Sequence, residues 1–336
     1  MKYFLCLFSF FLIGCAFFSA DEPVCERMNG LSFVAPPKPF KGNPMLEVKA
    51  VEADFIAVIP IAYTRPSAPT VRYNQSSWQW WGERPEGVAK TIDLANENGI
   101  NVLLKPQVYV PGSWTGGLDF SDEDWAKWEK EYRDYMMPMA RMAEEKGVKI
   151  FCIGTEFKMS TAQREQFWRE FIRDVRKIYS GKLTYAANWD EYKTLAFWDD
   201  LDFIGIDAYF PLSDAKTPTV AELKEAWKTP LYDIERIQQK FDKPIIFTEY
   251  GYMSVDGCAG KTWEIEPKVH ALPINEQGQA NAVQALHEVF SEKEYWAGGF
   301  IWKWFPEMKG HEGYPAKDYT PQGKIAEETL RKCFLE

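Results

Sequence analysis

Short apolar runs alternate with longer amphipathic stretches along most of the chain. Eight of these runs have the length and the content of β-branched and aromatic residues that are typical of strands. They cover residues 30–35, 55–61, 101–107, 149–156, 183–189, 203–209, 245–250 and 298–302. The pattern predicts eight strands with helices between them.

The intervals between the runs contain helical patterns. Apolar residues recur at three- and four-residue spacing over 167–179, which predicts an amphipathic helix. Ser121-Asp-Glu-Asp124 is typical of a capping box before another helix, from Trp125 to Lys146. Three glycines stand between a helix and the next strand, where a left-handed residue ends a helix without a Cβ clash. They are Gly99, Gly147 and Gly181.

The repeated strand–helix unit predicts a single (β/α)8 TIM barrel with extended loops on its C-terminal face. Eight units fit the roughly 310 residues that follow an N-terminal leader, and no Pro-, Gly- or Ser-rich linker divides them. We therefore expect one domain over residues 21–336. An open doubly wound sheet is the alternative. It is disfavoured because no G-x-G-x-x-G loop follows the first strand.

The first 20 residues are typical of an export leader. An apolar run over 3–14 follows Lys2 and is too short to span a bilayer comfortably. Leu12-Ile-Gly-Cys15 resembles a bacterial lipobox, in which the cysteine is lipidated; the alternative is ordinary signal-peptide cleavage nearby. We expect a protein that is secreted or anchored through a lipid on Cys15, in the bacterial periplasm or at the cell surface.

The four cysteines beyond the leader show no CxxC spacing, so a structural zinc site is not expected. Both ends of a closed barrel emerge near its N-terminal face. In an exported protein, Cys25 and Cys333 could therefore form a disulfide. Cys152 lies within a predicted strand and is expected to be a buried thiol.

The net charge, the aromatic content and the histidine spacing indicate which kinds of ligand the protein could bind. A net charge of −10 and a pI near 5.1 argue against nucleic acid or an anionic membrane, because both require a basic face. The chain holds 14 Trp and 16 Tyr, and aromatic rings can stack on sugars. Its three histidines lack an HExxH spacing, so neither a metal site nor another cofactor is expected. A neutral ligand fits these features.

Two of the strand-like runs end in a glutamate. Ile150-Phe-Cys-Ile-Gly-Thr-Glu156 and Ile245-Ile-Phe-Thr-Glu249 belong to the fourth and seventh strands, whose ends lie across the mouth of a barrel. Catalytic groups in α/β barrels lie at the C-terminal ends of strands. Glycoside hydrolysis requires one carboxylic acid and one carboxylate, so Glu156 and Glu249 are the candidate catalytic pair.

Other residues at strand ends and in loops are candidates for substrate binding. Lys105 could bind sugar hydroxyls and keep a neighbouring carboxylate ionised, and Tyr209 could donate a hydrogen bond to Glu249. Trp302 could form the floor beneath a sugar ring; Asp207 is interpreted as structural. The loops after the strands supply further aromatic residues, which are Tyr63, Trp78, Trp80, Trp81, Trp114, Tyr252 and Trp263. Trp114 and Tyr252 are the candidates that we select from them.

These motifs together resemble glycoside hydrolase family 113, whose characterised members are mainly β-1,4-mannanases with a retaining mechanism. The resemblance rests on Leu104-Lys-Pro106, Ile153-Gly-Thr-Glu156, Thr248-Glu-Tyr-Gly251 and Ile301-Trp302. It implies that Glu156 is the acid/base and that Glu249 is the nucleophile.

One position departs from the pattern of the wider clan. Many related enzymes have Asn immediately before the acid/base, where this chain has Thr155. The donor to the sugar 2-hydroxyl is then unassigned, and Asn188 and Lys105 are the candidates.

The sequence therefore predicts an exported glycoside hydrolase that cleaves β-1,4-mannan or manno-oligosaccharides. Two alternatives remain: the same mechanism on another neutral β-glycan, and a non-catalytic glycan-binding barrel. The presence of both glutamates disfavours a simple binding protein, because binding alone does not require two opposed carboxylates.

Overall fold

A computed structural model describes residues 27–74, 79–307 and 315–336. The leader, Cys15, Cys25 and Trp78 lie outside the described residues, so export, lipidation and the Cys25–Cys333 disulfide stay predictions. None of the helices within the described part of the chain is long and apolar enough to cross a bilayer.

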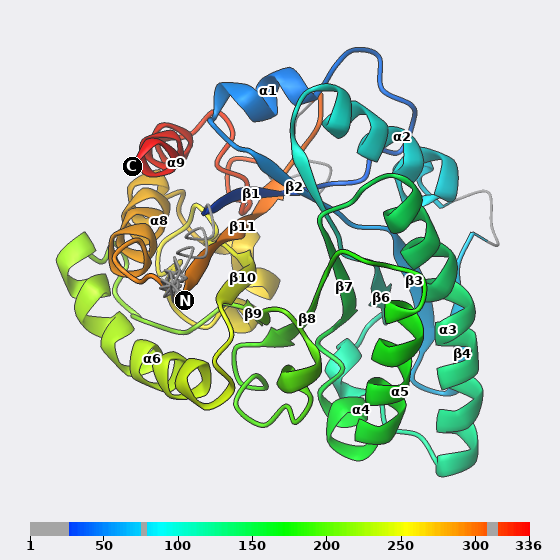
Figure 1. The fold of residues 1–336 in the computed structure, drawn as a ribbon. Coiled ribbons are helices and arrows are strands. Elements are labelled where there is room, and N and C mark those ends of the chain that lie inside the picture. The colour runs from blue at the N-terminus through cyan, green and yellow to red at the C-terminus, as the bar shows by residue number, and fades with distance from the viewer. Residues whose placement is uncertain (1–26, 75–78, 308–314) are drawn as a thin grey trace, which may run out of the picture.

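Eight parallel strands close into a barrel in the order β1-β11-β10-β9-β8-β7-β5-β2 (Figure 1). Each predicted run overlaps one of them, which confirms the (β/α)8 barrel and excludes the open sheet. The strands are β1 (Met28–Phe33), β2 (Phe55–Val58), β5 (Asn101–Leu104), β7 (Ile150–Thr155), β8 (Lys182–Asn188), β9 (Ile204–Asp207), β10 (Ile245–Tyr250) and β11 (Trp296–Trp304).

Helices surround the barrel and cover the outer face of its sheet (Figure 1). The larger ones are α2 (Pro85–Glu97), α3 (Asp122–Glu145), α5 (Glu165–Arg176), α6 (Val220–Phe241), α8 (Glu276–Phe290) and α9 (Ile325–Leu335). The shorter ones are α1 (Met45–Ala50), α4 (Lys158–Gln163) and α7 (Thr262–Ile265). Both predicted helices, over 125–146 and 167–179, are confirmed as α3 and α5. Ser121 caps α3, since its hydroxyl accepts from the Asp124 N–H at 3.3 Å.

Two of the predicted strand runs are each divided by a proline. The chain leaves the barrel after β2 and after β5, and it re-forms strands on the far side of Pro60 and Pro106. Proline has no N–H for a strand ladder, which explains the breaks. The continuations pair in a separate three-stranded sheet of order β4-β3-β6, formed by β3 (Ile61–Arg65), β4 (Ala68–Arg72) and β6 (Gln107–Tyr109). This sheet occupies part of what the sequence predicts as a long loop.

Much of the aromatic content lies in the core between the barrel and its helices. Six tryptophans are fully buried, namely Trp125, Trp128, Trp168, Trp198, Trp227 and Trp304. Trp128 stacks on Tyr132 with ring centroids 4.7 Å apart. Cys152 is completely buried inside the barrel, as predicted. The abundance of aromatic residues therefore reflects packing as well as any role in binding.

Two of the three predicted left-handed glycines are confirmed, with φ of 70° at Gly99 and 64° at Gly147. The prediction is wrong for Gly181, whose φ lies outside the left-handed region. A Cβ on Gly181 would lie 2.3 Å from the Tyr179 hydroxyl, which donates to the Val148 carbonyl. This glycine is therefore required for close packing, not for a helix-ending turn.

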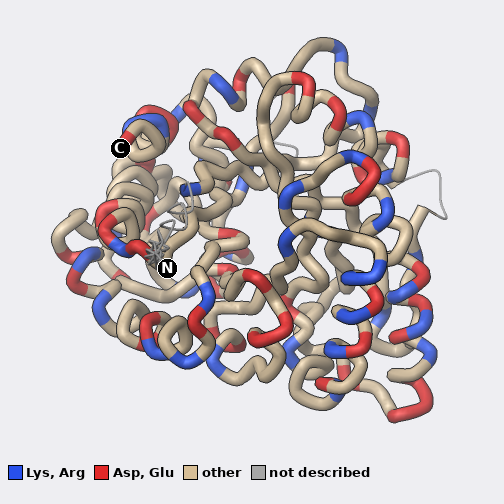
Figure 2. Tube along the Cα trace, viewed as in Figure 1, with Lys and Arg blue, Asp and Glu red and all other residues tan. Residues whose placement is uncertain are grey.

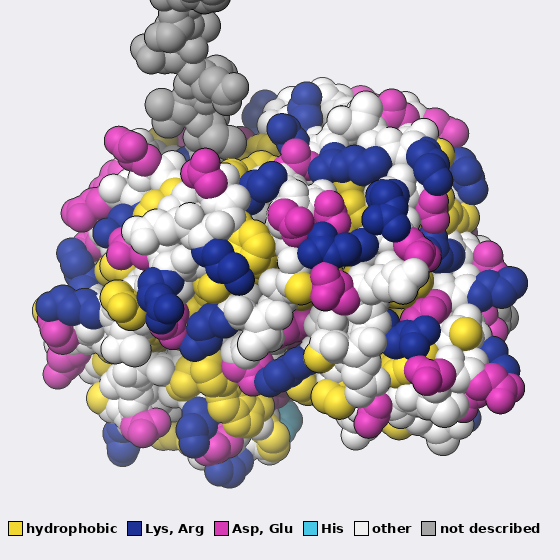
Figure 3. Space-filling model, turned by 60° about the horizontal axis from the view of Figure 1, so that its bottom comes forward, with side chains coloured by type: hydrophobic (Ala, Val, Ile, Leu, Met, Phe, Trp, Pro, Cys, Tyr) yellow, Lys and Arg dark blue, Asp and Glu magenta, His cyan; other side chains and the backbone are white. Residues whose placement is uncertain are grey.

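The outer surface carries both signs of charge. Lys and Arg alternate with Asp and Glu along the outer helices, and the face shown in space-filling form has the two signs interspersed (Figures 2 and 3). Many of these charges pair within one helix, as Lys130 does with Asp134 at 2.8 Å. Such exposed pairs contribute little to stability and fit an ordinary solvated surface.

The barrel closes where β1 pairs with β11, and one glycine is required at this contact. Gly298 lies opposite Met28 with φ of 108°, and a Cβ there would lie 2.2 Å from the Met28 carbonyl oxygen. We expect Gly298→Ala to lower the free energy of unfolding by about 2–4 kcal/mol through backbone strain and overpacking. Denaturant unfolding would measure it. Gly117→Ala is the control, since a Cβ at Gly117 meets nothing within 4 Å. Equal effects of the two substitutions would contradict this account.

Candidate active site

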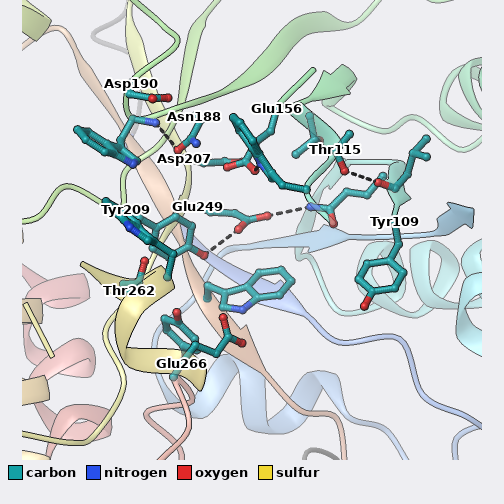
Figure 4. Close-up of a pocket in the computed structure, with 18 of the residues that line it drawn as sticks. Tyr109, Thr115, Glu156, Asn188, Asp190, Asp207, Tyr209, Glu249, Thr262 and Glu266 are labelled. Carbon is teal, nitrogen blue, oxygen red and sulfur yellow. Dashed lines mark hydrogen bonds between the residues drawn. The ribbon is translucent and has the colours of Figure 1, made fainter. Parts of the chain in front are cut away.

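A cleft of about 680 Å³ opens at the C-terminal ends of the barrel strands (Figure 4). Five of the sequence-predicted site residues line it together with Glu249, although they come from separate strands and loops. These five are Trp114, Glu156, Asn188, Tyr209 and Trp302. The closed barrel brings them together because all of its strands end at the same face.

Glu249 lies near the end of β10 and has only 7 % of its surface exposed. Its Oε1 accepts from Lys105 Nζ at 2.6 Å and from Gln107 Nε2 at 2.8 Å. Its Oε2 accepts from the Tyr209 hydroxyl at 2.8 Å (Figure 4). Three donors, two from the segment after β5 and one from the segment after β9, therefore fix this carboxylate and stabilise its negative charge.

Lys105 lies beneath Glu249 and is completely buried. Its ammonium contacts Asp207 Oδ1 at 3.2 Å as well as Glu249. Burial alone would lower the pKa of Lys105, but the charges of Asp207 and Glu249 raise it above its ordinary value. Lys105 is not among the described residues that line the cleft, and its ammonium contacts the two carboxylates; its predicted contact with sugar hydroxyls stays a prediction. Asp207 also accepts from the Thr248 hydroxyl at 2.7 Å.

Glu156 follows β7 directly and has a φ of 55°, in the left-handed region. Its Oε2 accepts from the Trp114 indole N–H at 2.7 Å. Burial and the charge of Glu249 raise the pKa of Glu156 to about 7, while the Trp114 hydrogen bond acts in the opposite direction. The carboxyl can thus hold a proton near neutral pH while Glu249 lies among donors, as catalysis by one acid and one carboxylate requires.

Asn188 and Trp302 line the cleft as the sequence predicts. Asn188 ends β8, and its side-chain oxygen accepts from the Trp189 N–H at 2.8 Å. Trp302 lies in β11 and is partly buried. Thr155, also in the lining, has a buried hydroxyl without a hydrogen-bond partner among the described residues.

Tyr252, like Lys105, is a sequence-predicted binding residue that does not line the cleft. Its side chain is buried, with 4 % of its surface exposed, and it is not part of the lining. Gln279 of α8 donates to the Tyr252 carbonyl at 2.8 Å, which holds this segment against the helix. Tyr252 therefore packs inward and away from the cleft.

Gln107, Trp189 and Glu266 are among the lining residues that sequence reasoning missed. Gln107 stands two residues after Lys105, and the two-residue period of an extended segment gave a signal that both side chains share one side. Trp189 directly follows Asn188, and its ring stacks on that of Trp263 at 5.5 Å between centroids. Glu266 begins the short helix η4 (Glu266–Ala271) beside Trp263. The stacked pair joins segments remote in sequence, so no local pattern could reveal it.

The lining of the cleft carries one sign of charge. Its described residues include five carboxylates and neither lysine nor arginine. The five are Glu156, Asp190, Asp207, Glu249 and Glu266. Asp190 also contacts Lys158 of α4 at 2.6 Å, outside the lining. A negatively charged ligand would find no cation among these residues.

The model of Glycoside Hydrolase Family 113 matches residues 42–324. The chain belongs to glycoside hydrolase family 113. It is therefore a glycoside hydrolase, as the sequence motifs predict. No match was found among the curated proteins.

Solved structures of family members have the same fold. A GH113 β-1,4-mannanase is 27% identical with a TM-score of 0.79, over 93% of this chain and 99% of the other. A complex of a GH113 β-1,4-mannanase is 26% identical with the same TM-score and coverage. The GH113 β-mannanase of Alicyclobacillus acidocaldarius, 23% identical, has a TM-score of 0.78 over 92% of this chain and 97% of the other. A Ruminococcus gnavus β-glucuronidase shares the fold at 17% identity and a TM-score of 0.62, over 94% of this chain and 50% of the other.

The Trp114 hydrogen bond gives a test of how the protein sets the proton affinity of Glu156. A hydrogen bond to the charged form lowers the pKa of a carboxyl group, so Trp114→Phe should raise the pKa of Glu156 above about 7. Carboxyl ¹³C NMR of glutamate-labelled protein would follow the titration, with Glu156→Gln used for assignment. Trp263→Phe is the control, because this tryptophan lines the same cleft but donates no hydrogen bond to Glu156. A titration unchanged by Trp114→Phe would contradict the proposed effect.

Proposed function

We propose that the enzyme hydrolyses β-1,4-linked mannan or manno-oligosaccharides with retention of anomeric configuration, by double displacement. The contrast between Glu156 and Glu249 carries this proposal. Glu156 has a pKa raised to about 7 and one hydrogen bond, whereas Glu249 accepts from three donors. A retaining glycosidase requires such a pair, one proton donor and one nucleophile.

In the first step, Glu156 protonates the glycosidic oxygen while Glu249 attacks the anomeric carbon. The bond to the leaving sugar breaks and an ester forms between the glycosyl unit and Glu249. Glu156, now ionised, then takes a proton from water, whose oxygen attacks the same carbon and displaces Glu249. Both carboxyl groups return to their original protonation states.

The neighbouring residues support these two roles. Lys105, Gln107 and Tyr209 orient the nucleophile before the reaction, so little reorganisation is needed as its charge changes. Trp302 offers an apolar surface beneath the reacting sugar.

The charge of the cleft favours a neutral glycan. A uronic acid would place its carboxylate among five acidic residues, without a lysine or arginine in the described lining to pair with it. Two of the structural neighbours described above are β-1,4-mannanases at 26% and 27% identity, and mannan is neutral. These observations support mannan over the glucuronides that the more distant neighbours are named for.

Export remains proposed from residues 1–20 alone.

Substitution of each glutamate should give a different kinetic defect. We expect Glu249→Gln to abolish turnover of every glycoside, because a neutral amide replaces the carboxylate nucleophile. Glu156→Ala should slow hydrolysis of natural oligosaccharides by about 10²–10⁴-fold but spare the first step on aryl glycosides with activated leaving groups. Single-turnover kinetics on both substrate types would separate the two defects. Wild-type activity of either variant on natural oligosaccharide would refute the assignment.

The substrate is tested by reducing-sugar release from β-1,4-mannan, glucomannan, cellulose, xylan, galactan and polygalacturonate. We expect release from the mannan-containing polymers alone, lost with Glu249→Gln, and none from the anionic polymer. Release from another neutral polymer would keep the mechanism but replace the substrate. Binding to a glycan without any release would instead identify a non-catalytic glycan-binding barrel.

A further inference from the structure

A buried carboxylate, Glu191, lies behind the cleft and has no role in the reaction described above. It stands in the turn after β8 with 1 % of its surface exposed. Its Oε1 accepts from the hydroxyls of Thr161 at 2.8 Å and Tyr185 at 2.9 Å. Its Oε2 accepts from the Asn188 N–H at 3.2 Å. All of these contacts are to neutral donors, and a buried carboxylate without a cation is costly to retain.

The contacts of Glu191 connect it to the segment that follows β7 and to the end of β8. The Tyr185 hydroxyl that donates to Glu191 also accepts from the Phe157 N–H at 2.6 Å. Phe157 directly follows Glu156, whose φ of 55° is a strained conformation for a residue with a side chain. Such conformations persist only where the surroundings fix them. Glu191 thus orients the tyrosine that holds the peptide next to Glu156.

On the other side, Glu191 holds the backbone of Asn188, which lines the cleft. The Glu191 N–H donates in return to the Asn188 carbonyl at 2.8 Å. The same two segments are joined a second time at the surface, where Lys158 of α4 contacts Asp190 at 2.6 Å. The turn after β8 and the segment after β7 are therefore joined at two places, and Glu191 forms the buried link.

We propose that Glu191 is a positioning residue that fixes Glu156 and Asn188 relative to each other in the cleft. The inference rests on the proposed role of Glu156 as the acid/base. Glu191 acts through Tyr185 and through the backbone of Asn188, and it does not itself reach the substrate.

The negative charge of Glu191 also affects the pKa of Glu156. The titratable groups that face it are Tyr185 of β8, Asp207 of β9 and Glu156 after β7. Burial raises the pKa of Glu191 to about 7, and its negative charge helps to raise the pKa of Glu156, which also experiences Glu249 and Lys105. Loss of this charge should lower the pKa of Glu156, so Glu156 would lose its proton at a lower pH.

Glu191→Gln tests both the positioning and the effect of the charge. The amide keeps the size of the side chain but removes its negative charge, and its NH2 group cannot accept the hydrogen bond that a carboxylate oxygen accepts. We expect kcat/KM on a β-1,4-manno-oligosaccharide to fall about 10- to 100-fold, with the alkaline limb of its pH profile moved to lower pH. Activity on an activated aryl glycoside should change less than about threefold, since that first step needs little protonation. Equal losses on both substrates, or an unmoved alkaline limb, would overturn the proposal.

Glu83→Gln is the matched control. Glu83 in η1 (Trp81–Glu83) is also buried, and burial raises its pKa to about 7 as well, but it does not line the cleft or contact Glu191. This substitution should leave the alkaline limb and the ratio of the two activities unchanged. A shift equal to that of Glu191→Gln would show that any buried carboxylate has the same effect and would overturn the proposal.

Tyr185→Phe separates position from charge. It breaks the link to the Phe157 N–H but leaves the Glu191 charge in place. We expect a similar loss on the oligosaccharide, and the double variant with Glu191→Gln should lose much less than the product of the single losses, because both act on one path. Multiplicative losses would overturn the proposed link.

A readout without substrate keeps this test independent of the proposed function. Carboxyl ¹³C NMR should show Glu156 titrating at lower pH in Glu191→Gln than in the wild type or in Glu83→Gln. If the wild-type protein cleaves none of the glycans, the proposed function fails, but this titration still decides whether Glu191 controls Glu156. An unchanged titration would overturn the proposal.

Discussion

The buried ammonium of Lys105 joins three strands of the barrel at its mouth. It contacts Asp207 of β9 and Glu249 of β10 from the end of β5, and none of the three has more than a small part of its surface exposed. Two carboxylates without the lysine would repel each other in a medium of low dielectric constant, and the lysine alone would be an uncompensated buried charge. Each charge is therefore tolerated only because the others are present. The position of Glu249 follows from this mutual dependence.

The same constraint explains why the two glutamates of the cleft differ. Glu249 shares the lysine and takes two further hydrogen bonds, so its negative charge is stabilised. Among the described residues, Trp114 alone donates to the Glu156 carboxyl, and burial together with the charge of Glu249 raises the pKa of Glu156 to about 7. The difference in hydrogen-bonding surroundings does not require different residue types. It arises from where the closed barrel places the available donors.

Features with a strong local pattern could be predicted from the sequence. The eight barrel strands, helices α3 and α5, and the placement of Glu156 and Glu249 at strand ends all follow from periodicity and from the barrel topology. The small sheet β4-β3-β6 was missed because Pro60 and Pro106 lie inside runs that look continuous. The stacking of Trp189 on Trp263 and the inward packing of Tyr252 depend on contacts between remote segments. No local pattern carries that information.

The proposed role of Glu156 as the acid/base would require support from residues beyond the cleft. Glu156 has a backbone conformation that is unfavourable for a residue with a Cβ, and it immediately follows a buried strand. Its own N–H donates to the Ala186 carbonyl in β8 at 2.8 Å, and the next N–H donates to Tyr185 of the same strand. The conformation is thus fixed from β8, and Glu191, which accepts a hydrogen bond from the Tyr185 hydroxyl, fixes the orientation of Tyr185 in turn. In the proposed mechanism Glu156 must transfer a proton within a narrow range of geometry, and Tyr185 and Glu191, which lie outside the cleft lining, hold it there.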